Sequence, residues 1–342
     1  MGARRLRDWL SQPLSSLEKI QKRQEAVAQF IQNSTTLDQF RESLKEVRDL
    51  ERMISRLSIG SGNARDLVQL HGALLQIPNI RTMINQVQCV NNATAPSLND
   101  SIFNEKESNE SPLLLSQLGN LLHDVPEVTE LISLSIVAEP PVALKEGGII
   151  RKGFNPALDK LRTGATEGKD WIAKLQQEEI EKTGITSLKV RYNSVFGYFI
   201  EVTKANLERV PEHYTRKQTL ANAERFITPE LKEMEGKILG SEERSQKLEY
   251  ELFQGVREQV LQWLPQIQEI SSALAQLDVL AGFAENARIH DHVCPNVRDE
   301  GVLNIDEGRH PVLEQSMVGD PFVPNDTLLE CKKQQIAVIT GP

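Results

Sequence analysis

The chain has 342 residues, of which 39% are hydrophobic, and carries a formal net charge of −9 at pH 7. This length predicts about two domains with real hydrophobic cores, which argues against a wholly disordered protein. The acidic balance argues against nucleic-acid binding over the whole surface, so any contact with DNA must be local.

The sequence favours a cytosolic protein with no membrane segment. No apolar run approaches the roughly 20 residues that a bilayer span needs, and residues 1–5 lead into an amphipathic helix instead of a signal-peptide core. Cys89, Cys294 and Cys331 are odd in number and far apart. Reduced thiols fit this spacing better than a disulfide framework does.

The first half of the chain is predicted to be helical. Leucines and other apolar residues recur three or four positions apart over residues 4–84, and again over 113–134. Residues 85–112, rich in Asn, Ser and charge, predict a polar loop or insertion. A short extended piece is expected over 143–150, and another helix over 156–182.

A β-hairpin is predicted next. Leu188, Val190 and Tyr192 alternate with polar residues, and residues 198–203 alternate in the same way after a stretch, 193–197, that suits a turn. A β unit embedded in a helical protein indicates a small domain at the tip of two helices, one outgoing and one returning.

The returning helix is the longest that the sequence predicts. It begins at Pro229, and no proline recurs until Pro265. At 1.5 Å per residue it reaches about 50 Å, enough to carry a displacement between distant sites. A plain bundle or coiled coil is an equal alternative. A further helix is expected over 267–289, followed by a β-rich segment.

The chain ends on an apolar strand, residues 335–340, that runs into Gly341 and Pro342. A phosphate-binding loop, G-x-x-x-x-G-K-[ST], begins in this way, and its backbone amides and lysine bind phosphates while its hydroxyl holds magnesium. We therefore expect a piece of a nucleotide-driven machine that stops before the lysine.

Several collinear motifs resemble the bacterial MutS family of DNA mismatch-repair ATPases. They are MGARRLRDWL (1–10), ANAERF (221–226), PELK (229–232), EGRHPV (307–312) and ITGP (339–342). The resemblance covers nearly the full chain and departs most at 85–112. It implies a mainly α fold with an inserted small β or α+β clamp, long lever helices, and the start of a P-loop α/β ATPase domain.

By this resemblance the chain divides into four parts. Residues 1–169 form the first part of a helical core, 170–228 a clamp that binds the DNA backbone, 229–290 the returning levers, and 291–342 the beginning of the ATPase domain. A mismatch-reading domain and a connector precede this region in the family.

The expected DNA contacts lie in the clamp. Residues 188–225 carry seven Lys or Arg against four Glu, a local charge of +3, and cations bind phosphates without reading sequence. By resemblance the DNA-binding candidates are Arg216, Lys217, Asn222 and Arg225. A solvated face with helix-pairing charges is the alternative for each of them.

The expected nucleotide contacts lie near the carboxyl end. Gly341 and Pro342 would start the phosphate loop, while Phe322, Val323 and Asn325 match family positions near the adenine. Phe322 could instead close a hydrophobic edge.

No catalytic or metal-binding residue is assigned, and Glu307, Arg309 and His310 are interpreted as structural. His290, His292 and Cys294 have metal-type side chains, but their spacing points them in different directions. The family reads mismatches with a Phe-x-Glu wedge. Here this triplet begins at Phe40, Phe103, Phe199 and Phe283, none in a matching context, so mismatch reading is expected outside this region.

The resemblance implies an intact protein that binds mismatched double-stranded DNA as a homodimer, hydrolyses ATP with Mg²⁺ and acts with downstream mismatch-repair factors in the bacterial cytosol. This region alone is expected to have no ATPase activity and to hold neither ATP nor Mg²⁺ securely. Two alternatives stay open: a structural helical rod without a DNA role, and a paralogue that acts on recombination or branched DNA.

Overall fold

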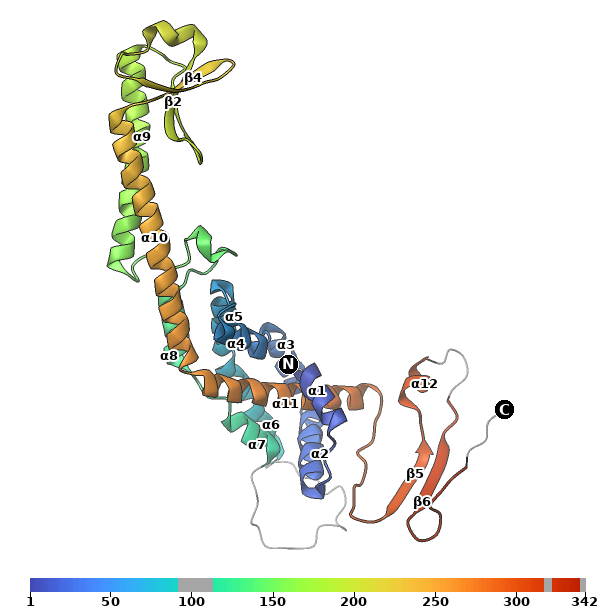
Figure 1. The fold of residues 1–342 in the computed structure, drawn as a ribbon. Helices are drawn as coiled ribbons and strands as arrows, with labels where there is room; N and C mark the ends of the chain where they lie inside the picture. Colours follow the sequence, from blue (N-terminus) through green and yellow to red (C-terminus); the bar gives the residue numbers. More distant parts are fainter. Residues whose placement is uncertain (92–112, 317–321, 339–342) are drawn as a thin grey trace.

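The computed structural model describes residues 1–91, 113–316 and 322–338. Figure 1 shows a helical body, a two-helix arm that rises from it and carries a small sheet at its far end, and a separate pair of strands near the carboxyl end. Of the helices in these described ranges, none combines the length and the apolar character needed to cross a bilayer.

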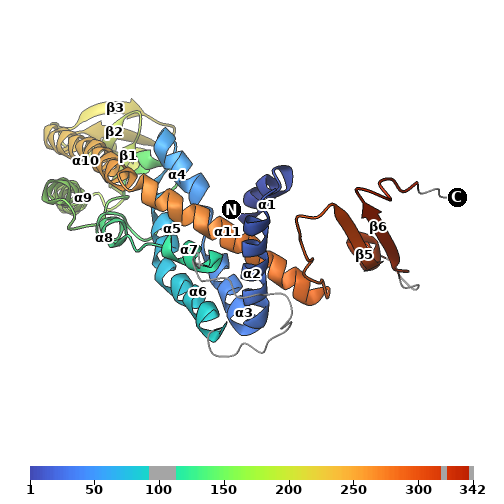
Figure 2. The same cartoon turned by 90° about the horizontal axis from the view of Figure 1, so that it is seen from below.

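The body is built from short helices packed around one long central helix, α11 (Leu264–Ile289). Figure 2 shows α11 crossing the body, with the strand pair beyond its carboxyl end. The surrounding helices are α1 (Gly2–Ser11), α2 (Leu17–Gln32), α3 (Ser34–Glu46), α4 (Leu50–Ile59), α5 (Ala64–Leu75), α6 (Ile77–Asn91), α7 (Leu114–Asn120) and α8 (Pro126–Ser135). The predicted helical character of this region is confirmed.

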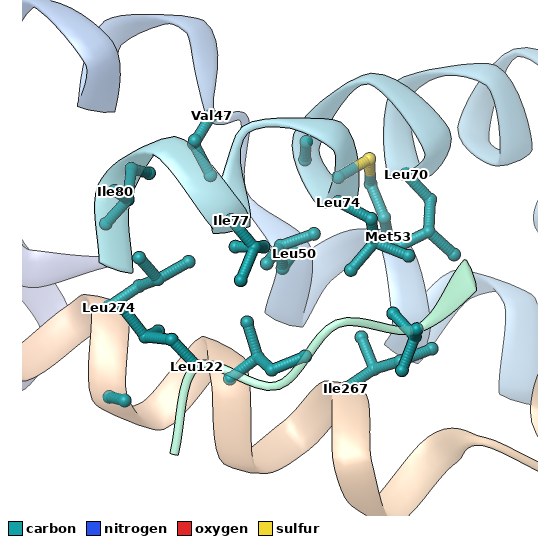
Figure 3. Packing of buried hydrophobic residues seen from close by; sticks show 14 of the residues in the cluster. Val47, Leu50, Met53, Leu70, Leu74, Ile77, Ile80, Leu122, Ile267 and Leu274 are labelled. Atoms are coloured by element: carbon teal, nitrogen blue, oxygen red, sulfur yellow. The ribbon is translucent and has the colours of Figure 1, made fainter. Parts of the chain in front are cut away.

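The core of the body lies between α11 and its neighbours. Leu50 and Met53 of α4, Leu70 and Leu74 of α5, and Ile267 of α11 converge in Figure 3, and all are buried. Burial on several sides explains why α11 is apolar around most of its circumference, as a helix in the middle of a core must be.

The predicted loop at 85–112 is wrong over its first seven residues, which continue α6 to Asn91. The apolar stripe of Ile80 and Ile84 extends to Val87, and all three side chains are fully buried. Asn33 Nδ2 also donates to the Val87 carbonyl at 3.3 Å. Residues 92–112 lie outside the described ranges.

The arm consists of α9 (Pro156–Thr183) and α10 (Pro229–Leu261), as the sequence predicted. Each helix has a proline in its first turn, and the Thr228 hydroxyl caps α10 by accepting from the Leu231 amide at 3.2 Å. The 33 residues of α10 span about 50 Å. Where α10 ends, Gln262 and Trp263 make the corner that leads into α11.

The sheet at the end of the arm, here called the tip sheet, has four antiparallel strands in the order β1-β2-β4-β3. They are β1 (Lys189–Asn193), β2 (Gly197–Thr203), β3 (Thr215–Thr219) and β4 (Ala223–Ile227), with a short 3₁₀ segment η2 (Lys204–Arg209) between β2 and β3. The predicted hairpin of β1 and β2 is confirmed. The sequence did not predict β3 and β4.

Two extended segments expected from the sequence take other forms. Residues 143–150 contain a 3₁₀ turn, η1 (Leu144–Glu146), and only Ile150 makes a bridge, to Ile136.

Near the carboxyl end, β5 (Val302–Gly308) and β6 (Asn325–Glu330) pair antiparallel, with α12 (Pro311–Ser316) between them. The predicted strand at 335–340 is wrong over residues 335–338, which form no strand, and the apolar side chains of Ile336 and Val338 are exposed instead of packed. Residues 339–342 lie outside the described ranges.

Candidate nucleic-acid interface

The tip sheet has one face on the arm and one face open. Val190 pairs with Ile200, and Ile200 pairs with Phe226, so these three side chains share a face. They pack against apolar residues of the arm such as Leu231 and Ile238. This packing fixes the sheet on the end of the arm and turns its other face away from the helices.

The open face is defined by six residues whose strand register places them on one side: Lys189, Arg191, Phe199, Glu201, Gln218 and Arg225. Phe199 is buried although it faces away from the arm. The Arg225 guanidinium covers its ring, 4.2 Å from the centroid. The ring attracts the positive charge of the guanidinium and so restricts the position of the Arg225 side chain.

Glu201 organises the cations of the open face. Its carboxylate lies 3.5 Å from Arg225 Nε and 3.7 Å from Arg191 Nη1. Arg225 also donates to Gln218 Oε1 at 2.8 Å, and only 19% of its side chain is exposed. Arg225, a predicted DNA contact, is therefore held in a defined position on the open face. Arg191 is the more exposed of these two cations, with 53% of its side chain accessible to solvent.

Lys217 lies at a β-bulge between Arg216 and Gln218. Its Nζ donates to the Phe196 carbonyl at 3.2 Å, so the side chain reaches the turn between β1 and β2. Lys217 and Lys189 are both exposed. Among the described residues, Lys189 has no carboxylate within ion-pair distance, which leaves its charge free for a ligand.

The other two predicted contacts lie elsewhere on the tip sheet. Arg216 aligns with Phe226, on the face opposite Arg225, and its Nη1 lies 3.2 Å from Glu224 Oε1. Asn222 is exposed in the turn before β4, and its carbonyl accepts from the Lys204 amide at 3.1 Å. The four predicted residues thus share one small sheet but not one face.

Sequence reasoning did not select Lys189 and Arg191, although it counted their charges. The signal was available in the alternation of β1, which places both on the same side as Glu201 once the hairpin register is known. Alternation alone does not give the register of β2 with β4, and that register brings Arg225 to the same row.

The tip sheet is also held to the arm by buried polar contacts. The Tyr214 hydroxyl donates to Glu179 Oε2 at 2.5 Å, and Lys182 Nζ lies 3.1 Å from the other carboxylate oxygen. Burial, followed by this hydrogen bond, raises the pKa of Tyr214. On the second helix, Glu235 accepts from the Tyr198 amide at 3.1 Å. The tip sheet is therefore anchored to both helices of the arm.

The predicted adenine contacts lie together where the chain enters β6. Phe322 is half-buried and Val323 is exposed, and Asn325 Nδ2 donates to the Val323 carbonyl at 2.9 Å. Gly341 and Pro342 lie outside the described ranges. Nucleotide binding by these residues stays a prediction.

The residues weighed as metal ligands follow α11. The rings of His290 and His292 are 5.6 Å apart, and Cys294 is exposed. Within the ranges that the structure describes, no three His, Cys, Asp or Glu side chains converge as ligands for a metal ion.

Comparison with known proteins finds one matching family model and relatives that are similar over the whole of this chain. Residues 1–284 match the family model described as MutS domain III. The chain is 44% identical over 342 residues to the DNA mismatch repair protein MutS of Halothermothrix orenii, covering all of this chain and 36% of that protein. It is 46% identical over 344 residues to the protein of the same name from Myxococcus xanthus, with the same coverage. The chain thus spans about a third of the length of these curated relatives.

Proposed function

This chain belongs to the MutS family, and on that premise we propose that it is the part of a DNA mismatch-repair protein that grips duplex DNA and couples that grip to ATP. The homologues' names support the repair role. The open face of the tip sheet supports the grip, because it presents cations at the end of a long arm on an otherwise acidic chain.

The proposed DNA contact is to the phosphate backbone. Lys189, Arg191 and Lys217 are exposed, and the first two lie on the open face beside Arg225. Glu201 and Phe199 hold Arg225 in place, so the face needs little reordering to meet a phosphate. Such contacts give affinity without base readout, which suits a grip on DNA of any sequence. Arg216 and Asn222 would reach a neighbouring part of the backbone.

The proposed coupling runs along the arm and through the body. The intact protein would bind mismatched duplex DNA as a homodimer, hydrolyse ATP with Mg²⁺ and act with downstream repair factors. Gly341, Pro342, Phe322, Val323 and Asn325 would contribute to the nucleotide site. Coupling between two sites is reciprocal, so DNA that favours one arm position would change nucleotide affinity by the factor with which nucleotide changes DNA affinity.

A salt titration tests the DNA contact. The affinity of the 342-residue chain for a fluorescent duplex is measured by anisotropy between about 50 and 200 mM salt. The variant combines Lys189→Gln, Arg191→Gln and Lys217→Gln. The slope of log affinity against log salt is negative, and its magnitude should fall by about 0.9 for each phosphate that the protein no longer neutralises, and so by up to about 2.7 for all three substitutions.

A control variant removes the same charge elsewhere. Arg48→Gln, Lys247→Gln and Lys332→Gln change three exposed cations that lie outside the tip sheet. This control should leave the salt slope unchanged. Equal slopes for both variants would reject the open face as the contact. No retention of DNA at low salt by the parent chain would favour the helical rod without a DNA role.

A further inference from the structure

One buried carboxylate at the base of the arm has no part in the DNA contact. Glu249 lies in α10 and is 2% exposed. An ionised carboxylate is costly to bury unless hydrogen bonds and an opposite charge compensate it. The partners of Glu249 therefore indicate what the structure gains from placing it there.

Glu249 binds two other parts of the chain at once. Its Oε1 accepts from the Ile150 amide at 2.8 Å and from the Ile149 amide, and its Oε2 accepts from the Gly148 amide at 3.0 Å. Arg162 of α9 donates to Oε1 at 2.6 Å. A carboxylate with four donors is fully satisfied, and such charge-assisted bonds are strong.

The amides that meet Glu249 converge because of two glycines. Gly147 and Gly148 have φ values of 71° and 75°, a conformation that most residues avoid. A Cβ on Gly147 would lie 3.2 Å from Glu249 Oε2. The local backbone is thus shaped around the carboxylate.

The segment that Glu249 binds is itself tied to the body. The Val137 amide donates to the Ile149 carbonyl at 3.0 Å, and the Arg151 amide donates to the Ser135 carbonyl at 2.7 Å. Ser135 is the last residue of α8, which belongs to the body. One carboxylate therefore connects both helices of the arm to the body.

We propose that Glu249 is a positioning residue that locks the arm at one angle to the body. Its importance for coupling rests on the proposed function, because a grip can report on a distant site only through an arm of defined direction. Without the carboxylate, three amides and Arg162 lose their common partner, and the arm stays joined to the body by the α10–α11 corner and by the remaining contacts.

The lock is tested by measuring the spread of arm positions. Spin labels are placed at Glu212→Cys near the tip sheet and Glu46→Cys in the body, after Cys89, Cys294 and Cys331 are changed to serine. Both label sites are exposed. Pulsed electron resonance then gives the distribution of distances between them. The variants are Glu249→Gln and Arg162→Met, and the control is Val256→Ala, a buried apolar residue on the same helix.

If Glu249 fixes the angle of the arm, both polar variants should at least double the width of the distribution of label distances. Val256→Ala should lower thermal stability and leave that width unchanged. Hydrogen exchange of the amides of Gly148 to Ile150 should become at least tenfold faster in Glu249→Gln. If Glu249→Gln does not fold, Arg162→Met decides alone. An unchanged width, or equal broadening by Val256→Ala, overturns the proposal. Because no DNA is present, this outcome is independent of the salt titration.

Discussion

The close contact between the two helices of the arm allows a prediction of opposite signs for two similar substitutions. Gly164 and Gly168 lie one turn apart in α9. A Cβ built on Gly168 would lie 2.4 Å from Ile238 Cγ1 and 3.0 Å from its Cδ1, whereas a Cβ on Gly164 meets nothing closer than Ser241 Oγ at 4.0 Å. Only the first substitution therefore forces the helices apart.

The expected magnitudes follow from two terms. Alanine in place of glycine in a helix gains about 1 kcal/mol from propensity, so Gly164→Ala should stabilise the arm by about that amount. Overpacking a buried contact costs about 1–3 kcal/mol. Gly168→Ala should therefore be neutral or destabilising by up to about 2 kcal/mol, because Ile238 is almost fully buried and has little room to move.

Urea unfolding followed by far-UV circular dichroism measures both free energies of unfolding. Hydrogen exchange of peptides from α9 and α10 locates the change in the arm. Ile238→Ala removes the atoms that clash, so Gly168→Ala should cost less in that background, with a coupling energy of about 1 kcal/mol or more. If Gly168→Ala stabilises the chain as much as Gly164→Ala does, the reasoning is refuted.

Two further predictions concern polar contacts. Tyr214→Phe removes the buried hydroxyl that donates to Glu179 and should cost about 1.5–3 kcal/mol in urea unfolding. Tyr250→Phe, at a more exposed tyrosine, is the control and should change little. Two hydrogen bonds from Arg4 lower the pKa of Asp49 from 3.8 to about 2. Because the folded-state pKa is depressed, this pair stabilises the fold fully above about pH 4 and loses its effect as the pH falls toward 2. The difference in melting temperature between the parent and Asp49→Asn should shrink over that interval, and a difference that stays constant would contradict it.

Local sequence patterns predicted the long elements well. Leucine spacing indicated the body helices, and the proline-free stretch after Pro229 indicated α10, because both patterns depend on neighbouring residues. Strand β3 was missed because its sequence, TRKQT, has no apolar residue to mark a buried face. It is an edge strand, and polar residues are common on edges.

The chemistry of the site was harder to predict because it depends on distant pairs. Arg225 was expected to touch DNA, but its position is set by Glu201, 24 residues away. Glu249 meets the Ile150 amide 99 residues earlier in the chain. The sequence shows that these charged side chains exist, but only the folded chain shows which ion pairs and hydrogen bonds they form.

The tip sheet is an insertion whose two ends meet. The chain leaves α9 at Gly184, in a left-handed conformation, and enters α10 at its Thr228 cap, while the paired helices run side by side below (Figure 1). Insertions with adjacent ends can be lengthened, shortened or exchanged without rerouting the rest of a fold. Replacing the whole β unit by a tight turn should thus leave a stable helical hairpin, so the tip sheet can vary while the arm that supports it stays unchanged.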